Sequence, residues 1–173
     1  DGVLVESAEN TGGPGKAVEK TARTEEKPTK LGKHQIETAK RDVDQTFPNN
    51  TAIRYTVGIG RPGLYEAGEF YVGAKKKWPS WTPTPGMLRR EPKKYEPHRN
   101  GMRGGLSNPL GARALYLFQP GRGDTFLRVH GTNDPKTIGR AVSNGCARLV
   151  NDQIVQFYDK VPLNTRVVLY PAT

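Results

Sequence analysis

The stretch HGTNDPKTIGRAVSNGCAR, residues 130–148, is the most informative part of this chain. It contains the only cysteine of the sequence, Cys146, and one of its three histidines, His130. A thiolate is a strong nucleophile, and an adjacent imidazole supplies the base that generates it. A lone cysteine is more often a small buried apolar residue. Here, however, Cys146 follows a polar turn, Ser143-Asn144-Gly145, and His130 enters a Gly-Thr-Asn turn, which favours a catalytic pair.

Charge and residue order refine this hypothesis. Arg140 and Arg148 place positive charge on either side of Cys146, and we expect this charge to favour the thiolate. The histidine precedes the cysteine, which excludes papain-like enzymes as a template because their order is the reverse. The three histidines lie in different segments without a C-x-x-C or H-E-x-x-H pairing. We therefore expect no metal site and no cofactor.

Composition divides the chain into two parts. Residues 1–48 hold one of the 14 aromatic residues, and residues 49–173 hold the other 13. A segment with so few aromatic residues buries too little apolar surface to offset its chain entropy. We therefore expect residues 1–33 to form a flexible tail or linker, and residues 34–173 to form one domain whose N-terminal edge is not sharply defined.

Charge is divided in the same way. The formal net charge is −1 over residues 1–48 and +11 over residues 49–173, which gives the +10 of the whole chain. A basic domain suits a polyanionic or carboxylate-rich partner, although surface charge also serves solubility. No apolar run approaches the roughly 18 residues that a membrane helix needs.

The hydrophobic pattern predicts a mainly β fold. Alternating and β-branched runs predict strands over residues 52–60, 69–73, 114–118, 125–130 and 166–170. No βαβ alternation is visible, which argues against a parallel α/β sheet. Residues 34–47 are ambiguous between a short strand and a short helix.

One helix is predicted after the cysteine. Asn151 suits the N-cap position, apolar residues then recur on one helical face as far as Val161, and Pro162 ends the helix. Residues 75–112 show no periodicity, and long loops of this kind are usually functional or disordered. Trp78 and Trp81 within this stretch argue against simple disorder.

Two other motifs carry weaker signals. Gly58-Ile59-Gly60-Arg61-Pro62-Gly63 matches the dinucleotide pattern G-x-G-x-x-G, but no long helix follows it, so we expect a turn. Lys75-Lys76-Lys77 beside Trp78 and Trp81 suggests single-stranded nucleic acid. We favour a solvated basic loop with inward-packed tryptophans, and therefore expect no nucleic-acid partner.

The stretch from about residue 52 to residue 170 resembles the L,D-transpeptidase catalytic domain of the YkuD family. The family motif is His-Gly, a spacer, and then Ser/Thr-His-Gly-Cys followed by an apolar residue and Asn or Arg. Here it stands as His130-Gly131-Thr132-Asn133 and Ser143-Asn144-Gly145-Cys146-Ala147-Arg148. The upstream stretches 54–61 (RYTVGIGR) and 78–83 (WPSWTP) are also similar to the family's bacterial cell-wall members. Asn144 stands where the family usually has a second histidine.

The resemblance implies a sandwich-like, mainly β catalytic domain with one or two short helices and long loops. It also implies a peptidoglycan L,D-transpeptidase. The Cys146 thiolate would attack an L,D peptide bond of a donor stem peptide and pass the resulting thioester to an amine. That acceptor would be another stem peptide or a lysine of an outer-membrane protein. We expect a monomer in the periplasm from which a signal segment has been removed.

The expected site follows from this chemistry. His130 transfers protons, the Gly131 carbonyl holds its ring, and the backbone N–H groups of Gly145 and Cys146 stabilise the oxyanion. Arg148 suits a substrate carboxylate because a guanidinium binds carboxylates bidentately. The expected substrate contacts are Thr132, Ser143, Asn144 and Arg148. Water as the acceptor would give L,D-carboxypeptidase or endopeptidase activity, and a catalytically silent wall-binding module is the remaining alternative.

Overall fold

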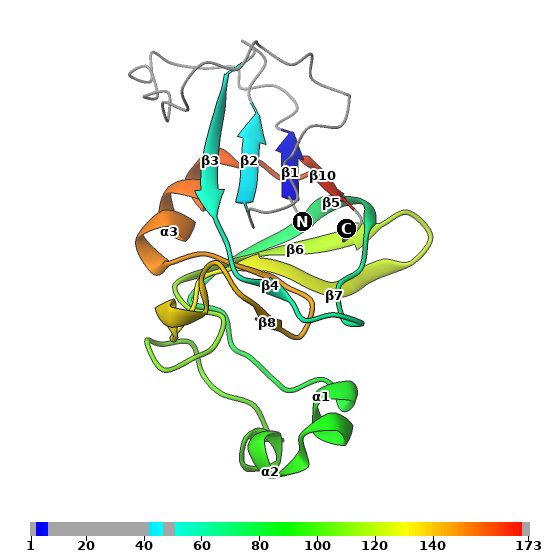
Figure 1. The fold of residues 1–173 in the computed structure, drawn as a ribbon, viewed down its shortest axis with the longest axis vertical. Coiled ribbons are helices and arrows are strands. Elements are labelled where there is room, and N and C mark those ends of the chain that lie inside the picture. Colours follow the sequence, from blue (N-terminus) through cyan, green and yellow to red (C-terminus); the bar gives the residue numbers. More distant parts are fainter. Residues whose placement is uncertain (1–2, 7–41, 47–50, 171–173) are drawn as a thin grey trace.

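The computed structural model describes residues 3–6, 42–46 and 51–170 (Figure 1). Within these ranges the chain is mainly β, as predicted. Eight strands form one curled sheet in the order β3-β2-β1-β10-β5-β6-β7-β9, and β4 pairs with β8 in a second, two-stranded sheet. The strands are β1 (Val3–Glu6), β2 (Asp42–Thr46), β3 (Ala52–Thr56), β4 (Ile59–Gly60), β5 (Gly68–Lys77), β6 (Arg113–Gln119), β7 (Gly123–His130), β8 (Ala141–Ser143), β9 (Ala147–Arg148) and β10 (Arg166–Leu169).

The three longest strands of the sheet form the antiparallel run β5-β6-β7. Leu115 and Leu117 of β6 and Val129 of β7 are almost completely buried, which fixes the inward face of this run. Gly121 in the turn after β6 and Gly123 at the start of β7 adopt positive φ angles, where a tight reversal is easiest for glycine. The reversal brings β7 back along β6 and ends it at His130.

The helix after the cysteine packs against the sheet. It is α3 (Asn151–Lys160), whose Ile154 and Phe157 are fully buried. The Phe157 ring meets that of Tyr55 edge-on, with 5.5 Å between centroids. The helix ends before Pro162, as predicted.

The start of α3 differs from the prediction. Val150 is the N-cap, and Asn151 is the first helical residue. The Asn151 side chain instead accepts the backbone N–H groups of Ala112 at 3.0 Å and Thr132 at 3.3 Å. The amide therefore joins two loops near the end of β7, because tertiary contacts compete with capping for the same oxygen.

The N-terminal residues also differ from the expectation. Val3–Glu6 form β1, which pairs in parallel with β2 and antiparallel with β10. The expected tail over residues 1–33 is therefore wrong for these residues, because Val-Leu-Val favours a strand and β10 supplies a partner. Residues 7–41 lie outside the described residues, so the domain boundary at residue 34 stays a prediction. The ambiguous stretch 34–47 contains β2.

Residues 81–102 form a helical lobe that projects away from the sheet at the bottom of Figure 1. Backbone hydrogen bonds between Trp81 and Met102 close its neck. The lobe contains α1 (Pro85–Arg90), α2 (Pro92–Tyr95) and the 3-10 turn Glu96–His98. Sequence periodicity missed these helices because each is too short to show a repeating apolar face.

The predicted basic loop at residues 75–77 is wrong. These lysines end β5, and Lys75 donates a 2.6 Å hydrogen bond to the Tyr158 carbonyl. Trp78 is 45% exposed and does not pack inward, whereas the Trp81 ring packs against that of Tyr95. The G-x-G-x-x-G stretch forms β4 and a turn, as expected. No helix within the described ranges is long and apolar enough to cross a membrane.

Candidate active site

A cavity of about 570 Å³ contains both members of the predicted catalytic pair. One side, the sheet wall, comprises Tyr116, Phe126, Arg128, His130, Ser143, Asn144, Cys146 and Arg148. The opposite side, the lobe wall, includes Trp81, Thr82, Thr84, Met87, Lys94, Tyr95, His98 and Met102. The long aperiodic region of the sequence thus supplies half of the site.

His130 is the last residue of β7 and is 3% exposed. Its Nδ1 lies 2.6 Å from the Gly131 carbonyl oxygen. Burial lowers the pKa of the imidazole to about 3, and the nearby Arg148 and Arg128 charges act in the same direction. The ring is therefore neutral at physiological pH.

The loop before Cys146 is held by its own side chains. Ser143 Oγ donates to the Cys146 carbonyl at 2.7 Å and accepts the Gly145 N–H at 3.2 Å. Gly145 has a φ of 120°, and a Cβ atom there would lie 2.8 Å from the Leu64 carbonyl oxygen. Serine and glycine at these positions are therefore dictated by the turn that presents the thiol.

Cys146 is intermediate in exposure as a residue, and its Sγ lies 3.8 Å from the Phe126 carbonyl oxygen. Burial of the group raises the pKa of this thiol, while the Arg128 backbone N–H and the charges of Arg128 and Arg148 lower it. The net effect is a raised pKa, which favours the neutral thiol and not the thiolate expected from the sequence. Desolvation outweighs the arginines, and Arg140 lies exposed.

Asn144 uses its whole side-chain amide within the protein. Its Oδ1 accepts Nη2 of Arg61 and Nη2 of Arg90, each at 3.1 Å, and its Nδ2 donates to the Tyr95 hydroxyl at 2.8 Å. Arg61 also forms a 2.6 Å ion pair with Glu91. Asn144, expected as a substrate contact, therefore joins the nucleophile loop to the lobe.

The remaining expected contacts divide into two groups. Arg148 lines the cavity, and its Nε is buried without a hydrogen-bond partner among the described residues. Its backbone N–H and carbonyl both pair with Gly58. Thr132 does not line the cavity, because its hydroxyl is used in hydrogen bonds to the backbone of Asp134.

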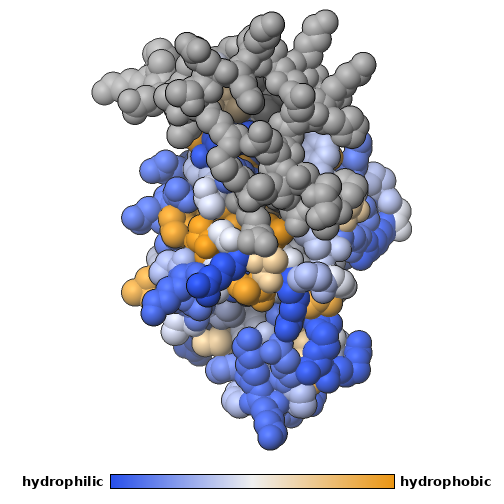
Figure 2. All heavy atoms as spheres, in the orientation of Figure 1, coloured by the Kyte–Doolittle hydropathy of each residue, from blue (hydrophilic) through white to orange (hydrophobic). Residues whose placement is uncertain are grey.

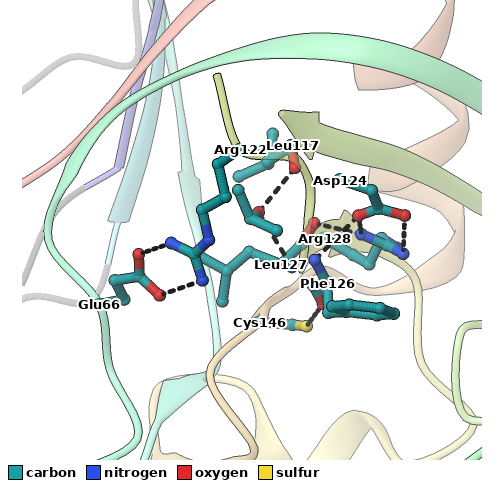
Figure 3. Close-up of polar contacts among 9 residues, drawn as sticks. Glu66, Leu117, Arg122, Asp124, Phe126, Leu127, Arg128 and Cys146 are labelled. Carbon is teal, nitrogen blue, oxygen red and sulfur yellow. Dashed lines mark hydrogen bonds and ion pairs between the residues drawn. The ribbon is translucent and has the colours of Figure 1, made fainter. Parts of the chain in front are cut away.

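Sequence reasoning missed a second group of residues on the sheet wall, shown in Figure 3. Phe126 lines the cavity, Arg128 lies beside Cys146, and Asp124 forms a bidentate ion pair with Arg128. Phe126 and Arg128 belong to the predicted strand over residues 125–130, and Asp124 directly precedes it; the alternation of this strand gives no sign of an irregularity at Phe126. No group of three or more His, Cys, Asp or Glu side chains suited to a metal ion occurs in the described part of the chain.

The fold and site correspond to a known class of catalytic domain. The model of the YkuD family, described as "L,D-transpeptidase catalytic domain", matches residues 43–169. The chain therefore belongs to the YkuD family.

Individual relatives extend this comparison. The chain is 38% identical over 121 residues to "Probable L,D-transpeptidase ErfK/SrfK" of Escherichia coli, a match that covers 69% of this chain and 37% of that protein. A solved structure from Brucella melitensis, described as "Probable carnitine operon oxidoreductase caia", is 45% identical over 75% of this chain and 80% of its own, with a TM-score of 0.48.

The fold is shared with L,D-transpeptidases of low sequence similarity. The "Ldtfm-avibactam carbamoyl enzyme" matches with a TM-score of 0.51 and 15% identity, over 73% of this chain and 44% of that one. This match concerns the fold alone. The chain spans little more than a third of the length of its Escherichia coli relative.

Proposed function

We propose that this domain is a peptidoglycan L,D-transpeptidase that works through a thioester on Cys146. The observation that carries the proposal is the shared cavity: Cys146 lines it together with a buried, neutral His130. Family membership supports the reaction class. The location that follows from this substrate is periplasmic or extracellular.

The contact with Gly131 defines which nitrogen of His130 acts as the base. A carbonyl oxygen only accepts hydrogen bonds, so Nδ1 at 2.6 Å carries the proton and Nε2 is unprotonated. The lowered pKa of His130 and the raised pKa of Cys146 keep both groups neutral at rest. Proton transfer from Sγ to Nε2 then accompanies the attack on substrate.

The reaction proceeds in two acyl transfers. Sγ attacks the carbonyl carbon of the donor's L,D peptide bond as Nε2 takes the thiol proton, and the carbon–nitrogen bond then breaks. The leaving amine of the D-amino acid takes the proton from His130, which leaves a thioester. The acceptor amine gives a proton to His130 and attacks the thioester, and the sulfur leaves and recovers its proton.

Backbone and charge complete the proposed site. The Gly145 N–H is engaged by Ser143 Oγ, so the Cys146 N–H is the better placed of the two expected oxyanion donors. Arg148 is the proposed partner of a substrate carboxylate, because the residue lines the cavity with Cys146 and its Nε has no hydrogen-bond partner among the described residues. Asn144 contributes indirectly, because its hydrogen bonds to Arg90 and Tyr95 hold the lobe beside the nucleophile loop.

The acceptor decides the biological outcome. Another stem peptide would give a crosslink, a lysine of an outer-membrane protein would give anchoring, and water would give L,D-carboxypeptidase or endopeptidase activity. The chemistry at Cys146 is the same in each case. We place the crosslinking reaction first because it follows most directly from the family's transpeptidase activity.

Purified muropeptides with mass spectrometry of the products test this proposal. We expect a crosslinked dimer that lacks one D-amino acid, and the loss of this product in the Cys146→Ala and Cys146→Ser variants. Shortened monomers alone would identify a hydrolase. Full turnover by Cys146→Ala would overturn the thiol mechanism, and a wild-type protein that changes no muropeptide would favour a silent wall-binding module.

A further inference from the structure

Strand β7 contains a bulge beside the nucleophile. Its pairing with β6 runs from Tyr116 opposite Arg128 to Phe118 opposite Asp124, so residues 125–127 face Leu117 alone. Phe126 at the centre of this bulge has a φ of 63°, in the left-handed region. Bulges of this kind redirect side chains and are frequent beside active sites.

Polar contacts hold the bulge in place (Figure 3). Asp124 Oδ1 accepts the Phe126 N–H at 2.8 Å, and the Asp124 carboxylate forms hydrogen bonds of 2.6 and 2.9 Å with Arg128. The Arg128 guanidinium stacks 4.1 Å from the centre of the Tyr116 ring. Thr125 Oγ1 donates to the Leu117 carbonyl at 2.6 Å. The conformation of Phe126 is therefore imposed by its neighbours.

This conformation is unfavourable for phenylalanine. A left-handed backbone costs free energy for any residue with a Cβ atom, and glycine would avoid that cost. Phe126 gains little in return, since its side chain is 67% exposed and the Arg128 guanidinium lies 5.9 Å from its ring centre. Stability of the free protein alone thus favours glycine at this position.

The position of the ring suggests what it does. The exposed large apolar side chains of the described part are Trp78, Leu106, Phe126, Val142 and Leu163. Phe126 alone among them lines the cavity, and its carbonyl oxygen lies 3.8 Å from the thiol sulfur. The cavity thus has an apolar surface at the residue whose carbonyl contacts the thiol.

We propose that Phe126 is a specificity-determining residue, whose ring supports the aliphatic part of the donor stem peptide when the scissile carbonyl reaches Cys146. The inference rests on the proposed function, because the donor is the ligand of this cavity. Arg148 and the ring then divide the recognition: the cation takes a carboxylate, and the ring takes the apolar portion of the same peptide. Binding energy from such a contact favours donors that carry an aliphatic portion at this point.

Substitution of Phe126 in the full chain tests this inference. We expect Phe126→Gly to raise KM for a muropeptide donor about tenfold, since burying one aromatic side chain contributes on this scale. The midpoint of urea unfolding stays the same or rises, and the rate of Cys146 alkylation by iodoacetamide changes little. Phe126→Asn, which also tolerates positive φ, gives the same result. Phe126→Tyr keeps the ring and retains a KM near that of the wild type.

Trp78 provides a matched control. It is another exposed aromatic residue at positive φ, with a φ of 46°, but it lies outside the cavity. We expect Trp78→Gly to leave KM unchanged, because the KM effect of Phe126→Gly arises from the place of that ring in the cavity. An unchanged KM in both Phe126→Gly and Phe126→Asn, with the wild type active, would overturn this inference alone. A wild-type protein that turns over no donor would overturn the proposed function and this inference together.

Discussion

The two walls of the cavity are built from different interactions. The sheet wall continues into the apolar core, where Leu115, Leu117 and Val129 are at most 1% exposed. The lobe wall has almost no core: α1 contains no buried residue, and α2 contains only Tyr95. Figure 2 shows the lobe as a largely hydrophilic surface below the more apolar middle of the molecule.

The difference places the reacting groups on the wall that the core holds rigid. Cys146 and His130 stand on strands and loops fixed by the core, so the reacting groups are held rigidly. Asn144 joins the nucleophile loop to the lobe through its hydrogen bonds with Arg90 and Tyr95, and the Arg61–Glu91 ion pair adds a second link. Contacts of this kind are individually weak. We therefore expect replacement of the reacting groups Cys146 and His130 on the sheet wall to abolish or strongly reduce turnover, and changes in the lobe to alter binding.

The largest effect is expected from the proposed base, His130. A second histidine, His98, lines the cavity from the opposite wall and serves as the comparison. His130→Gln removes the proposed base, and we expect kcat to fall by about 10²–10⁴-fold. His98→Gln, on the lobe wall, changes kcat far less. Muropeptide turnover measures both variants. Similar losses in the two would contradict the division between the walls.

A matched pair of leucines compares the stability of the two regions. Leu115 is fully buried in the core, and Leu88 is partly exposed in α1. We expect Leu115→Ala to lower the free energy of unfolding by about 2–5 kcal/mol because it leaves a cavity. Leu88→Ala costs much less. Urea denaturation gives both values, and equal losses would show that the lobe has a core of its own.

Asn144 tests how the lobe is attached. Asn144→Ala removes three hydrogen bonds, two of which reach the lobe at Arg90 and Tyr95, and we expect it to weaken docking of the lobe by about 1–3 kcal/mol. Amide hydrogen exchange in residues 85–98 then accelerates and KM for the donor rises. Asn144→Asp keeps the acceptor for both arginines and restores most of the protection. Unchanged exchange in the alanine variant would refute this attachment.

The buried imidazole of the sheet wall predicts a pH dependence of stability. The pKa of His130 is lowered to about 3 in the folded protein, so between about pH 6.5 and 3 the unfolded chain binds the proton first. The stability that the protein gains by keeping His130 neutral is complete above about pH 6.5 and is lost progressively as the pH falls from 6.5 towards 3. The slope is at most about 1.4 kcal/mol per pH unit. His130→Gln removes this component between pH 6.5 and 5, and an unchanged slope in that variant would show that the histidine is solvated.

Sequence and structure agree where the information is local. The strands 114–118 and 125–130 and the end of the helix before Pro162 follow from alternation and from proline. Cys146 and His130 could be paired because each stands in a distinctive turn, and the structure places both in one cavity.

The remainder of the site depends on contacts between distant segments. Asn144 meets Arg61, which follows β4, and two residues of the lobe, at separations of 49 to 83 positions along the chain; the bulge at Phe126 depends on pairing with β6. The raised pKa of the thiol depends on burial, which charge counting along the chain does not reveal. These features could not be predicted from local sequence patterns.

Trapping of the acyl-enzyme tests the central claim most directly. The protein is incubated with ertapenem, a carbapenem whose strained β-lactam carbonyl acylates nucleophiles, and its intact mass and proteolytic peptides are measured. We predict one adduct per chain, located on Cys146, formed more slowly by His130→Gln and absent from Cys146→Ala. An adduct that forms equally well in Cys146→Ala, or that maps to another residue, would contradict the account.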